Sequence, residues 1–132
     1  MAEQRVIPQA ATLAGVGQIA VRVHDVERAT RFYRDALGLA YLFSAPKLAF
    51  FDCGGVRLML TLPESSEFDH PGSIIYFRVA DIHGAHALLQ DRGVSFKDVP
   101  HLSARLPDHE LWMAFFEDPE GNTLALMSEI RD

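Results

Sequence analysis

The chain has 132 residues, enough for one ordinary domain with a buried core. Its net charge of −6, from 12 lysine and arginine residues against 18 aspartate and glutamate residues, argues against nucleic acid or an anionic membrane as the main partner. The single cysteine, Cys53, excludes an internal disulfide, and no apolar run has the roughly 20 residues of a membrane helix or the layout of a signal peptide. We therefore expect a cytoplasmic protein.

The first half of the chain predicts a strand, a helix and three more strands. Residues 1–14 show no sustained period and predict a loose arm, whereas the alternation over 17–23 predicts a half-buried strand. Asp25 is a suitable N-cap for the helix that follows, and Gly38 is placed to end it at the C′ position. Further strands are predicted over 39–44, 47–52 and 56–62, with a tight turn at 53–55.

The second half has the same order. Residues 63–72 contain two prolines and read as a linker, after which a strand is predicted over 73–79 and a helix from the cap Asp81 to Gly93. Strands are then expected over 94–99, 111–116 and 122–127, with an irregular stretch at 100–110. The predicted organisation is one domain, 1–132, with module one at about 15–62 and module two at about 73–128.

An internal repeat supports this organisation. A shift of 56 positions places the cap Asp25 on Asp81, and it superimposes the apolar positions of the two predicted helices. In the hairpins, Phe50-Phe51 matches Phe115-Phe116 and Gly55 matches Gly121. Each half is therefore a βαβββ module, and the predicted fold class is α+β.

Two stretches of sequence resemble a known family. The opening, Gln18 to Asp25 followed by Ala29-Thr-Arg-Phe-Tyr33 and Ala36-Leu-Gly-Leu39, and the ending, Phe115-Phe-Glu-Asp-Pro-Glu-Gly-Asn122, resemble the glyoxalase/bleomycin-resistance/dioxygenase superfamily, whose members are also called vicinal oxygen chelate proteins. The resemblance covers about residues 15–127. It implies that the two βαβββ modules form an incomplete barrel around a central cavity, with helices outside the sheet, and that the protein is a homodimer.

The resemblance also locates the positions at which metal-dependent members hold a divalent ion. These lie on the first and last strand of each half and here carry Gln18, Met59, Ile74 and Ala125. Gln18 is the one plausible oxygen ligand among them, whereas a catalytic metal generally needs about three protein ligands. A shift of one residue in the second-half strands introduces no ligand set. We therefore predict neither a metal nor another cofactor.

Strand alternation and loop position select the candidate ligand-binding residues. Arginines on the face opposite the helices suit a carboxylate or phosphate, although they could instead pair with acidic residues at the strand ends, and the aromatic and Met residues could line a chamber or pack in the core. The candidates are Gln18, Arg22, Phe51, Arg57, Met59, Tyr76, Arg78, His101, His109, Trp112, Phe116 and Met127. We expect His83 and His86 on the polar outer face of their helix, and His24 and His70 in solvent.

Two functions follow from these residues. The first is a protein that binds a small organic molecule, anionic or aromatic, in its cavity, either to sequester it or as an accessory binding protein. The alternative is a glyoxalase-like lyase, isomerase or dioxygenase, working without metal or with an unrecognised metal site, in which His109 or Glu110 acts as acid or base. A purely structural subunit with a filled cavity is a third possibility.

Overall fold

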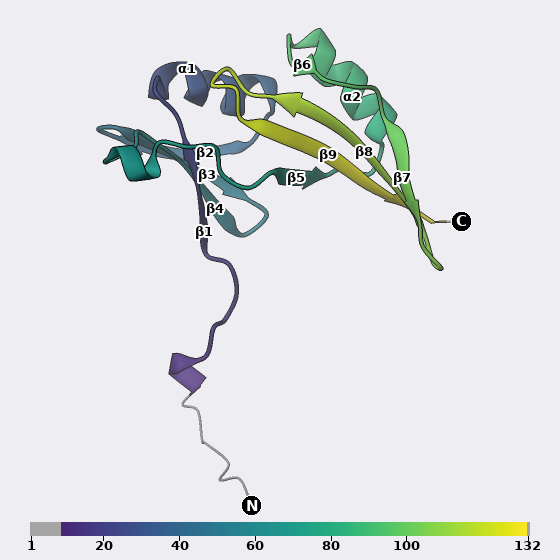
Figure 1. Ribbon diagram of the computed structural model, residues 1–132, viewed down its shortest axis with the longest axis horizontal. Helices are drawn as coiled ribbons and strands as arrows, with labels where there is room; N and C mark the ends of the chain where they lie inside the picture. The colour runs from purple at the N-terminus through teal and green to yellow at the C-terminus, as the bar shows by residue number, and fades with distance from the viewer. Residues whose placement is uncertain (1–8, 132) are drawn as a thin grey trace, which may run out of the picture.

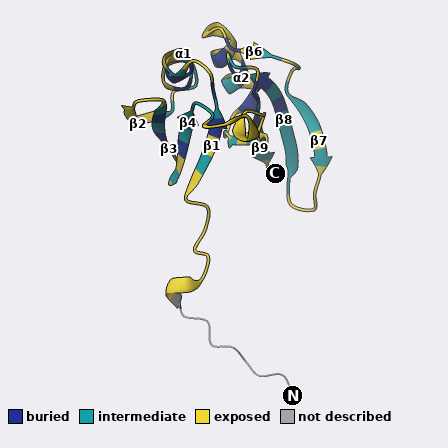
Figure 2. Cartoon of the chain, turned by 60° about the vertical axis from the view of Figure 1, so that its left-hand side comes forward, coloured by how far each residue is buried: buried dark blue, intermediate teal, exposed yellow. Residues whose placement is uncertain are grey.

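The computed structural model describes residues 9–131, so the first eight residues of the predicted arm and Asp132 lie outside the described residues. Two sheets stand side by side, and helices α1 and α2 lie on the same side of them, as Figure 1 shows. The described part of the arm, which includes a short 3-10 turn η1 (Gln9–Ala11), projects away from this body, and its residues 10–17 are exposed (Figure 2). Within the described range, no helix has the length and hydropathy needed to cross a membrane.

The first sheet comes from the first half of the chain. Its strand order is β1-β4-β3-β2, with β1 parallel to β4 and the other neighbours antiparallel. The strands are β1 (Gln18–Arg22), β2 (Ala40–Ala45), β3 (Leu48–Cys53) and β4 (Val56–Thr61). Helix α1 (Val26–Arg31) runs on into a π-helical turn, η2 (Phe32–Ala36), and a short 3-10 turn, η3 (Ser66–Phe68), lies in the segment between the sheets.

The second sheet repeats the first, except that two strands, β6 and β7, pair with β8 where the single strand β2 pairs with β3. Strand β5 is parallel to β9, which pairs with β8, and β8 pairs with both β6 and β7. The elements are β5 (Ile75–Arg78), α2 (Ile82–Asp91), β6 (Ser95–Phe96), β7 (His101–Arg105), β8 (Glu110–Glu117) and β9 (Thr123–Ile130). The predicted α+β fold is confirmed, and its two sheets form an open rather than a closed barrel.

The predicted helix caps are present. The Asp25 side chain accepts a hydrogen bond from the backbone N–H of Arg28, and Asp81 accepts one from Gly84. Gly38 follows the first helix with a φ of 74°, as a C′ glycine does. The helix between Asp25 and Gly38 is not uniform, because the N–H of Leu37 donates to the carbonyl of Phe32, five residues back.

The segment predicted as irregular, 100–110, contains strand β7, so this prediction was wrong. The predicted strand at 94–99 is also shorter, reduced to β6. Both strands pair with β8, at different parts of its length, and the break between them includes Pro100, which has no N–H to give to a ladder. At this break the carboxylate of Asp98 accepts the N–H of Phe115 at 2.8 Å. A side chain thus replaces one ladder hydrogen bond.

The core lies between the helices and the sheets. Alternate strand residues, Val21, Leu58, Leu60, Leu124 and Leu126, point to this side, and all five are buried. The prediction for His86 was wrong. His86 was expected on the outer face of its helix, but it is 9% exposed and its ring lies 4.3 Å from that of Phe96, because the α2 helix turns this position toward the sheet. The His83 ring lies 5.5 Å from that of Trp112.

The turn between β8 and β9 ties the two halves together. Glu120 accepts hydrogen bonds from the backbone N–H groups of His24 and Asp25 and from the Arg28 guanidinium. Asn122 donates to the carbonyl of Arg22, 100 residues earlier in the sequence. The turn of the second module therefore caps the first helix of the first module.

Candidate functional site

Strand register places a set of polar and aromatic side chains on the side of the sheets opposite the helices, which we call the helix-free face. Residues that are paired in register point to the same side of a sheet. In the first sheet these pairs are Gln18 with Arg57, Ala20 with Met59 and Arg22 with Thr61. In the second sheet the helix-free face carries Tyr76, Arg78, His101, Met113, Phe115, Ala125 and Met127. Seven of the predicted ligand-binding residues therefore share this face: Gln18, Arg22, Arg57, Met59, Tyr76, Arg78 and Met127, and His101 joins them from β7.

Two contacts order the first sheet's part of this face. The Gln18 side-chain amide lies 3.7 Å from the Met59 sulfur, with its N–H directed to the sulfur. The Arg57 guanidinium lies 5.5 Å from the centre of the Phe50 ring, the distance of a cation–π contact. These contacts hold both polar groups against the sheet.

Aromatic rings occupy the second sheet's part. Tyr76 and Phe115 flank Ala125 on neighbouring strands, and their ring centres are 6.0 Å apart in an edge-to-face arrangement. The methyl side chain of Ala125 lets the two rings approach, and Ala125 is fully buried. The His101 ring stacks on Phe115 with centres 6.3 Å apart, and its Nδ1 lies 3.0 Å from the carbonyl oxygen of Val99.

A cavity of about 540 Å³ opens between the neighbouring edges of β1 and β5, and we call it the β1–β5 cavity. Gln18, Arg22, Ile74, Tyr76 and Thr123 line it. A smaller cavity of about 320 Å³ is lined by Met59, Thr61, Phe68 and His70, and it shares Ala20, Arg22 and Gly72 with the first. Together they offer the volume of an ordinary small-molecule site.

Arg22 lies at the junction of these two cavities. Its side chain is 17% exposed, and its Nη1 lies 3.5 Å from the carboxylate of Asp69. The Nε atom is buried and has no hydrogen-bond partner among the described residues. Asp69 also lies 2.8 Å from Nε2 of His24 at the end of β1; the His24 side chain is 52% exposed, as expected from the sequence.

Three of the predicted ligand contacts lie on the other side of the sheet. Phe51 is paired with Leu58, Phe116 with Leu124 and Trp112 with Ser128, all on the helix side. Phe51 and Phe116 are fully buried in the core, and the Trp112 indole donates to Glu110 at 3.2 Å. Adjacent strand residues point in opposite directions, so Phe50 and Phe115, not Phe51 and Phe116, lie on the helix-free face.

The two candidate acid–base residues lie near the hairpin between β7 and β8. Nδ1 of His109 lies 2.8 Å from a carboxylate oxygen of Asp108. Glu110 accepts from Trp112 and lies 3.7 Å from Arg105. Neither residue lines the two cavities of the helix-free face. The structure therefore does not bring His109 or Glu110 together with Gln18, Arg22 and Tyr76.

The sequence analysis missed Phe50, Phe115 and Asp69. A signal for the two aromatic residues was present, because a turn at 53–55 pairs Cys53 with Val56, which places Phe51 opposite the helix-facing Leu58 and leaves Phe50 on the other side. Because the internal repeat matches Phe50 with Phe115, it predicts that Phe115 also lies on the helix-free face. Asp69 had no comparable signal, since it lies in the segment between the sheets.

The two-module fold is also found in known proteins. A family model described as the Glyoxalase/Bleomycin resistance protein/Dioxygenase superfamily matches residues 15–126. The chain belongs to this superfamily. A glyoxylase-like domain-containing protein from Didymella fabae is 29% identical over an alignment of 126 residues that covers 84% of this chain and 91% of that protein.

Solved structures of the superfamily have the same fold. A member from Sphaerobacter thermophilus matches with a TM-score of 0.74 and 28% identity, covering 89% of this chain and 98% of that one. A lactoylglutathione lyase from Agrobacterium tumefaciens matches with a TM-score of 0.68 and 24% identity, covering 89% and 95%. At this identity, the similarity to the lactoylglutathione lyase supports the fold alone.

The superfamily includes metal-dependent members, so the donor chemistry of this chain decides whether an ion suits it. Gln18 and Met59 do meet on the helix-free face, as the metal positions require. A thioether is a poor ligand for hard divalent ions, however, and Ile74 and Ala125 carry no donor atom. In the part of the chain that the structure describes, no three His, Cys, Asp or Glu side chains come together in a metal-binding group. These residues do not fit a catalytic divalent cation.

Proposed function

We propose that this superfamily member binds a small organic molecule with an aromatic body and an anionic group in the β1–β5 cavity. The observation that carries the proposal is the placement of Arg22 at the junction of two cavities, with its side chain 17% exposed. Its Nε has no hydrogen-bond partner among the described residues, so the protein does not use all the donors of this guanidinium, and a carboxylate of a ligand would pair with it through charge-assisted hydrogen bonds.

The rest of the lining suits such a ligand. Tyr76 is 41% exposed and presents an aromatic surface, while Gln18 offers an amide that is only weakly engaged by the Met59 sulfur. An aromatic ring between the strand edges would contact Tyr76 and Ile74, and its acidic group would pair with Arg22. Sequestration of a compound, or delivery of it to another protein, needs no further chemistry from the chain.

The test compares 2-naphthoate with 2-naphthol by isothermal titration calorimetry. Binding of 2-naphthoate, and a loss of affinity of about tenfold or more in Arg22→Gln, are expected if the guanidinium pairs with the carboxylate. Arg105→Gln is the matched control, because the Arg105 side chain is 76% exposed on β7. Equal affinity of Arg22→Gln and the unmodified protein for 2-naphthoate would overturn the role of Arg22.

Catalysis by His109 or Glu110 stays a separate prediction. It requires a substrate that reaches the hairpin between β7 and β8, and a His109→Asn variant with unchanged turnover on an identified substrate would exclude it. The homodimer implied by the superfamily and the cytoplasmic location also stay predictions. Sedimentation equilibrium measures the first and fractionation of cells the second.

A further inference from the structure

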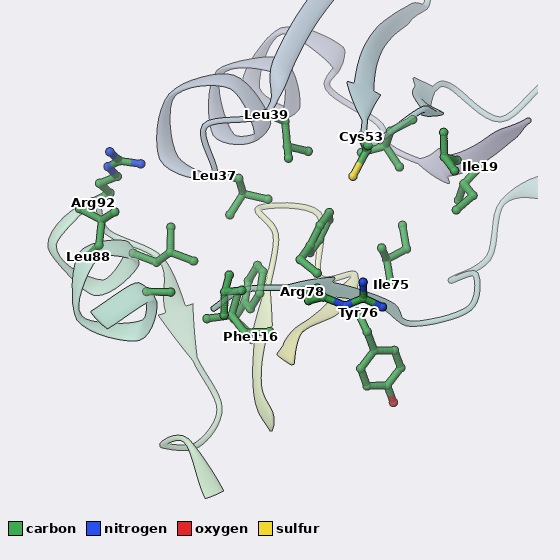
Figure 3. A pocket seen from close by; sticks show the side chains of 18 residues that line it. Ile19, Leu37, Leu39, Cys53, Ile75, Tyr76, Arg78, Leu88, Arg92 and Phe116 are labelled. Atoms are coloured by element: carbon green, nitrogen blue, oxygen red, sulfur yellow. The ribbon is translucent and has the colours of Figure 1, made fainter. Parts of the chain in front are cut away.

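A further cavity lies on the helix side, between the two modules. It has a volume of about 610 Å³, and we call it the inter-module cavity. Figure 3 shows its walls, with Leu37 and Leu39 after the first helix, Cys53 at the end of β3, Leu88 on α2 and Arg92 at the C-cap of α2. It shares Ile19, Ile75 and Tyr76 with the β1–β5 cavity, and the edge strand β5 also contributes Arg78, but most of its lining comes from the apolar side of each sheet.

The internal repeat explains why this cavity exists. At one contact between the modules, the β8–β9 turn packs on the first helix, and the buried Tyr33 hydroxyl donates to Asp118 at 2.7 Å. The 56-residue shift places Tyr33 on Leu89, and the hairpin match places Asp118 on Cys53. The Tyr33–Asp118 hydrogen bond, which joins the β8–β9 turn to the first helix, therefore has no counterpart between the β3–β4 turn and α2.

The two turns also differ in length. Four residues separate Phe116 from Gly121, but three separate Phe51 from Gly55, so the β3–β4 turn lacks a residue equivalent to Glu120. The helix residue that Glu120 binds, Arg28, is Gly84 in α2 under the same shift. A Cβ added at Gly54, which lines the cavity, would meet no atom within 4 Å. The missing turn residue and side chains leave the space between α2 and the β3–β4 turn unfilled.

The lining chemistry selects a class of ligand. Thirteen of the lining residues are Ile, Leu, Val, Ala or Phe, and the charged ones are Arg78 and Arg92, with no acidic residue among those described. The Arg92 guanidinium is held in place, because its Nη1 donates to the carbonyl of Ala36 at 3.2 Å. Its remaining N–H groups can meet an anion.

From these observations we propose that the inter-module cavity is a second binding site, for an apolar molecule that carries one acidic group. The apolar body lies between α2 and the β3–β4 turn, and the acidic group pairs with Arg92. A ligand of this kind contacts both modules at once, so it stabilises their arrangement. This proposal is independent of ligand binding at Arg22.

Cys53 provides the readout, because it is the single cysteine of the chain and it lines this cavity. Burial, followed by the nearby charge of Asp52, raises the pKa of the Cys53 thiol, so alkylation is measured at mildly alkaline pH. The protein is treated with N-ethylmaleimide in the presence of octanoate or of 1-octanol, and the rate of modification is followed by mass spectrometry.

We expect octanoate to slow alkylation of Cys53 in a saturable way, and 1-octanol to do so only at concentrations about tenfold higher, since it lacks the charge. Arg92→Gln is expected to raise the octanoate midpoint by about tenfold and to leave that of 1-octanol unchanged. Arg22→Gln and Arg105→Gln, which alter groups outside this cavity, are expected to leave both midpoints unchanged.

Filling the cavity provides the second variant. Ala85 lines it from α2, so Ala85→Leu is expected to abolish protection by octanoate while the folded protein keeps its circular dichroism spectrum. If this variant does not fold, the comparison of octanoate with 1-octanol on the unmodified chain still tests whether the inter-module cavity binds an apolar molecule with an acidic group. Unchanged alkylation of Cys53 at saturating octanoate, or equal protection by octanoate in Arg92→Gln, would overturn the proposal.

Discussion

The hydroxyl of Tyr33 donates a 2.7 Å hydrogen bond to the carboxylate of Asp118, and both residues are buried although 85 positions separate them in the sequence. Asp118 also accepts the backbone N–H groups of Glu120 and Asn122 and the side-chain amide of Asn122. One carboxylate thus shapes the β8–β9 turn and joins it to the first helix. The contact that orders the two modules is polar and fully enclosed.

Removal of the Tyr33 hydroxyl tests this contact. Tyr33→Phe is expected to lower the free energy of unfolding by about 1–3 kcal/mol, because the buried Asp118 carboxylate loses a donor. Urea denaturation measures the change. Tyr41→Phe is the control: its hydroxyl bonds to Ser44 at an exposed position, so its effect is expected to be a few tenths of a kcal/mol at most. Equal effects of the two substitutions would show that burial of the Tyr33 bond adds nothing.

The Tyr33 phenol itself provides a spectroscopic prediction. Burial, followed by the Asp118 charge, raises the pKa of Tyr33 well above its ordinary value. Absorbance near 295 nm, which reports tyrosinate, is compared during alkaline titration between the unmodified protein and Tyr33→Phe. The two curves are expected to differ only where circular dichroism shows unfolding. A difference that develops in the folded protein would contradict the enclosure of this phenol.

Glu120 predicts a pH dependence of stability. Burial raises the pKa of Glu120, but two backbone N–H groups and the Arg28 guanidinium outweigh this effect, so its pKa lies below the ordinary value. A carboxyl group with a lowered folded-state pKa stabilises the protein above its unfolded-state pKa of about 4.3, and this contribution disappears as the pH falls through the folded-state pKa.

Glu120→Gln is therefore expected to destabilise the protein by about 1–3 kcal/mol at pH 7, and the difference from the unmodified protein should shrink below about pH 4. Denaturation at a series of pH values measures it. Glu117→Gln is the control, because Glu117 forms an exposed ion pair with Lys97. A Glu120→Gln deficit that stays constant from pH 7 to pH 3 would show that charge plays no part.

Thr30 carries a buried hydroxyl with no hydrogen-bond partner among the described residues. Thr30→Val keeps the shape and removes the unpaired group, so it is expected to leave stability unchanged or to raise it by about 1 kcal/mol. Thr61→Val is the matched control and is expected to lower stability, because its hydroxyl donates to the carbonyl of Leu62 at 3.0 Å. Thermal unfolding compares the two, and a clear loss in Thr30→Val would mean that its hydroxyl is bonded after all.

Lys47 is the non-glycine residue with a positive φ, 72°, among those described, and it follows Pro46 in the β2–β3 turn. The left-handed region costs an ordinary L-residue about 1–2 kcal/mol, whereas asparagine adopts it more readily. Lys47→Asn is expected to raise the free energy of unfolding by a few tenths to about 1 kcal/mol. Lys47→Ala keeps the strain and should give no gain, so an equal gain from both would trace the effect to lost charge instead.

Local patterns in the sequence predicted most elements of the fold. The alternation of Ile19, Val21 and Val23, the caps Asp25 and Asp81 and the glycine after each helix act over a few residues, and a repeat of these signals identified two similar modules. Strand β7 was missed because its residues pair with β8 beyond a break, and no local alternation marks such a break. Arg22, Met59 and Tyr76 were correctly assigned to the helix-free face by alternation alone.

The amino-acid sequence by itself thus determined the α+β class and the side of the sheet on which the polar residues lie, because these depend on periodicities of two and 3.6 residues. The resemblance to the superfamily came from the motifs at the two ends of the chain. Tertiary structure alone decided that Asp69 meets Arg22, that Tyr33 meets Asp118, and that the space beside Cys53 stays open. Each of these depends on how a turn in one module packs on the other module, and no local period of the chain carries that information.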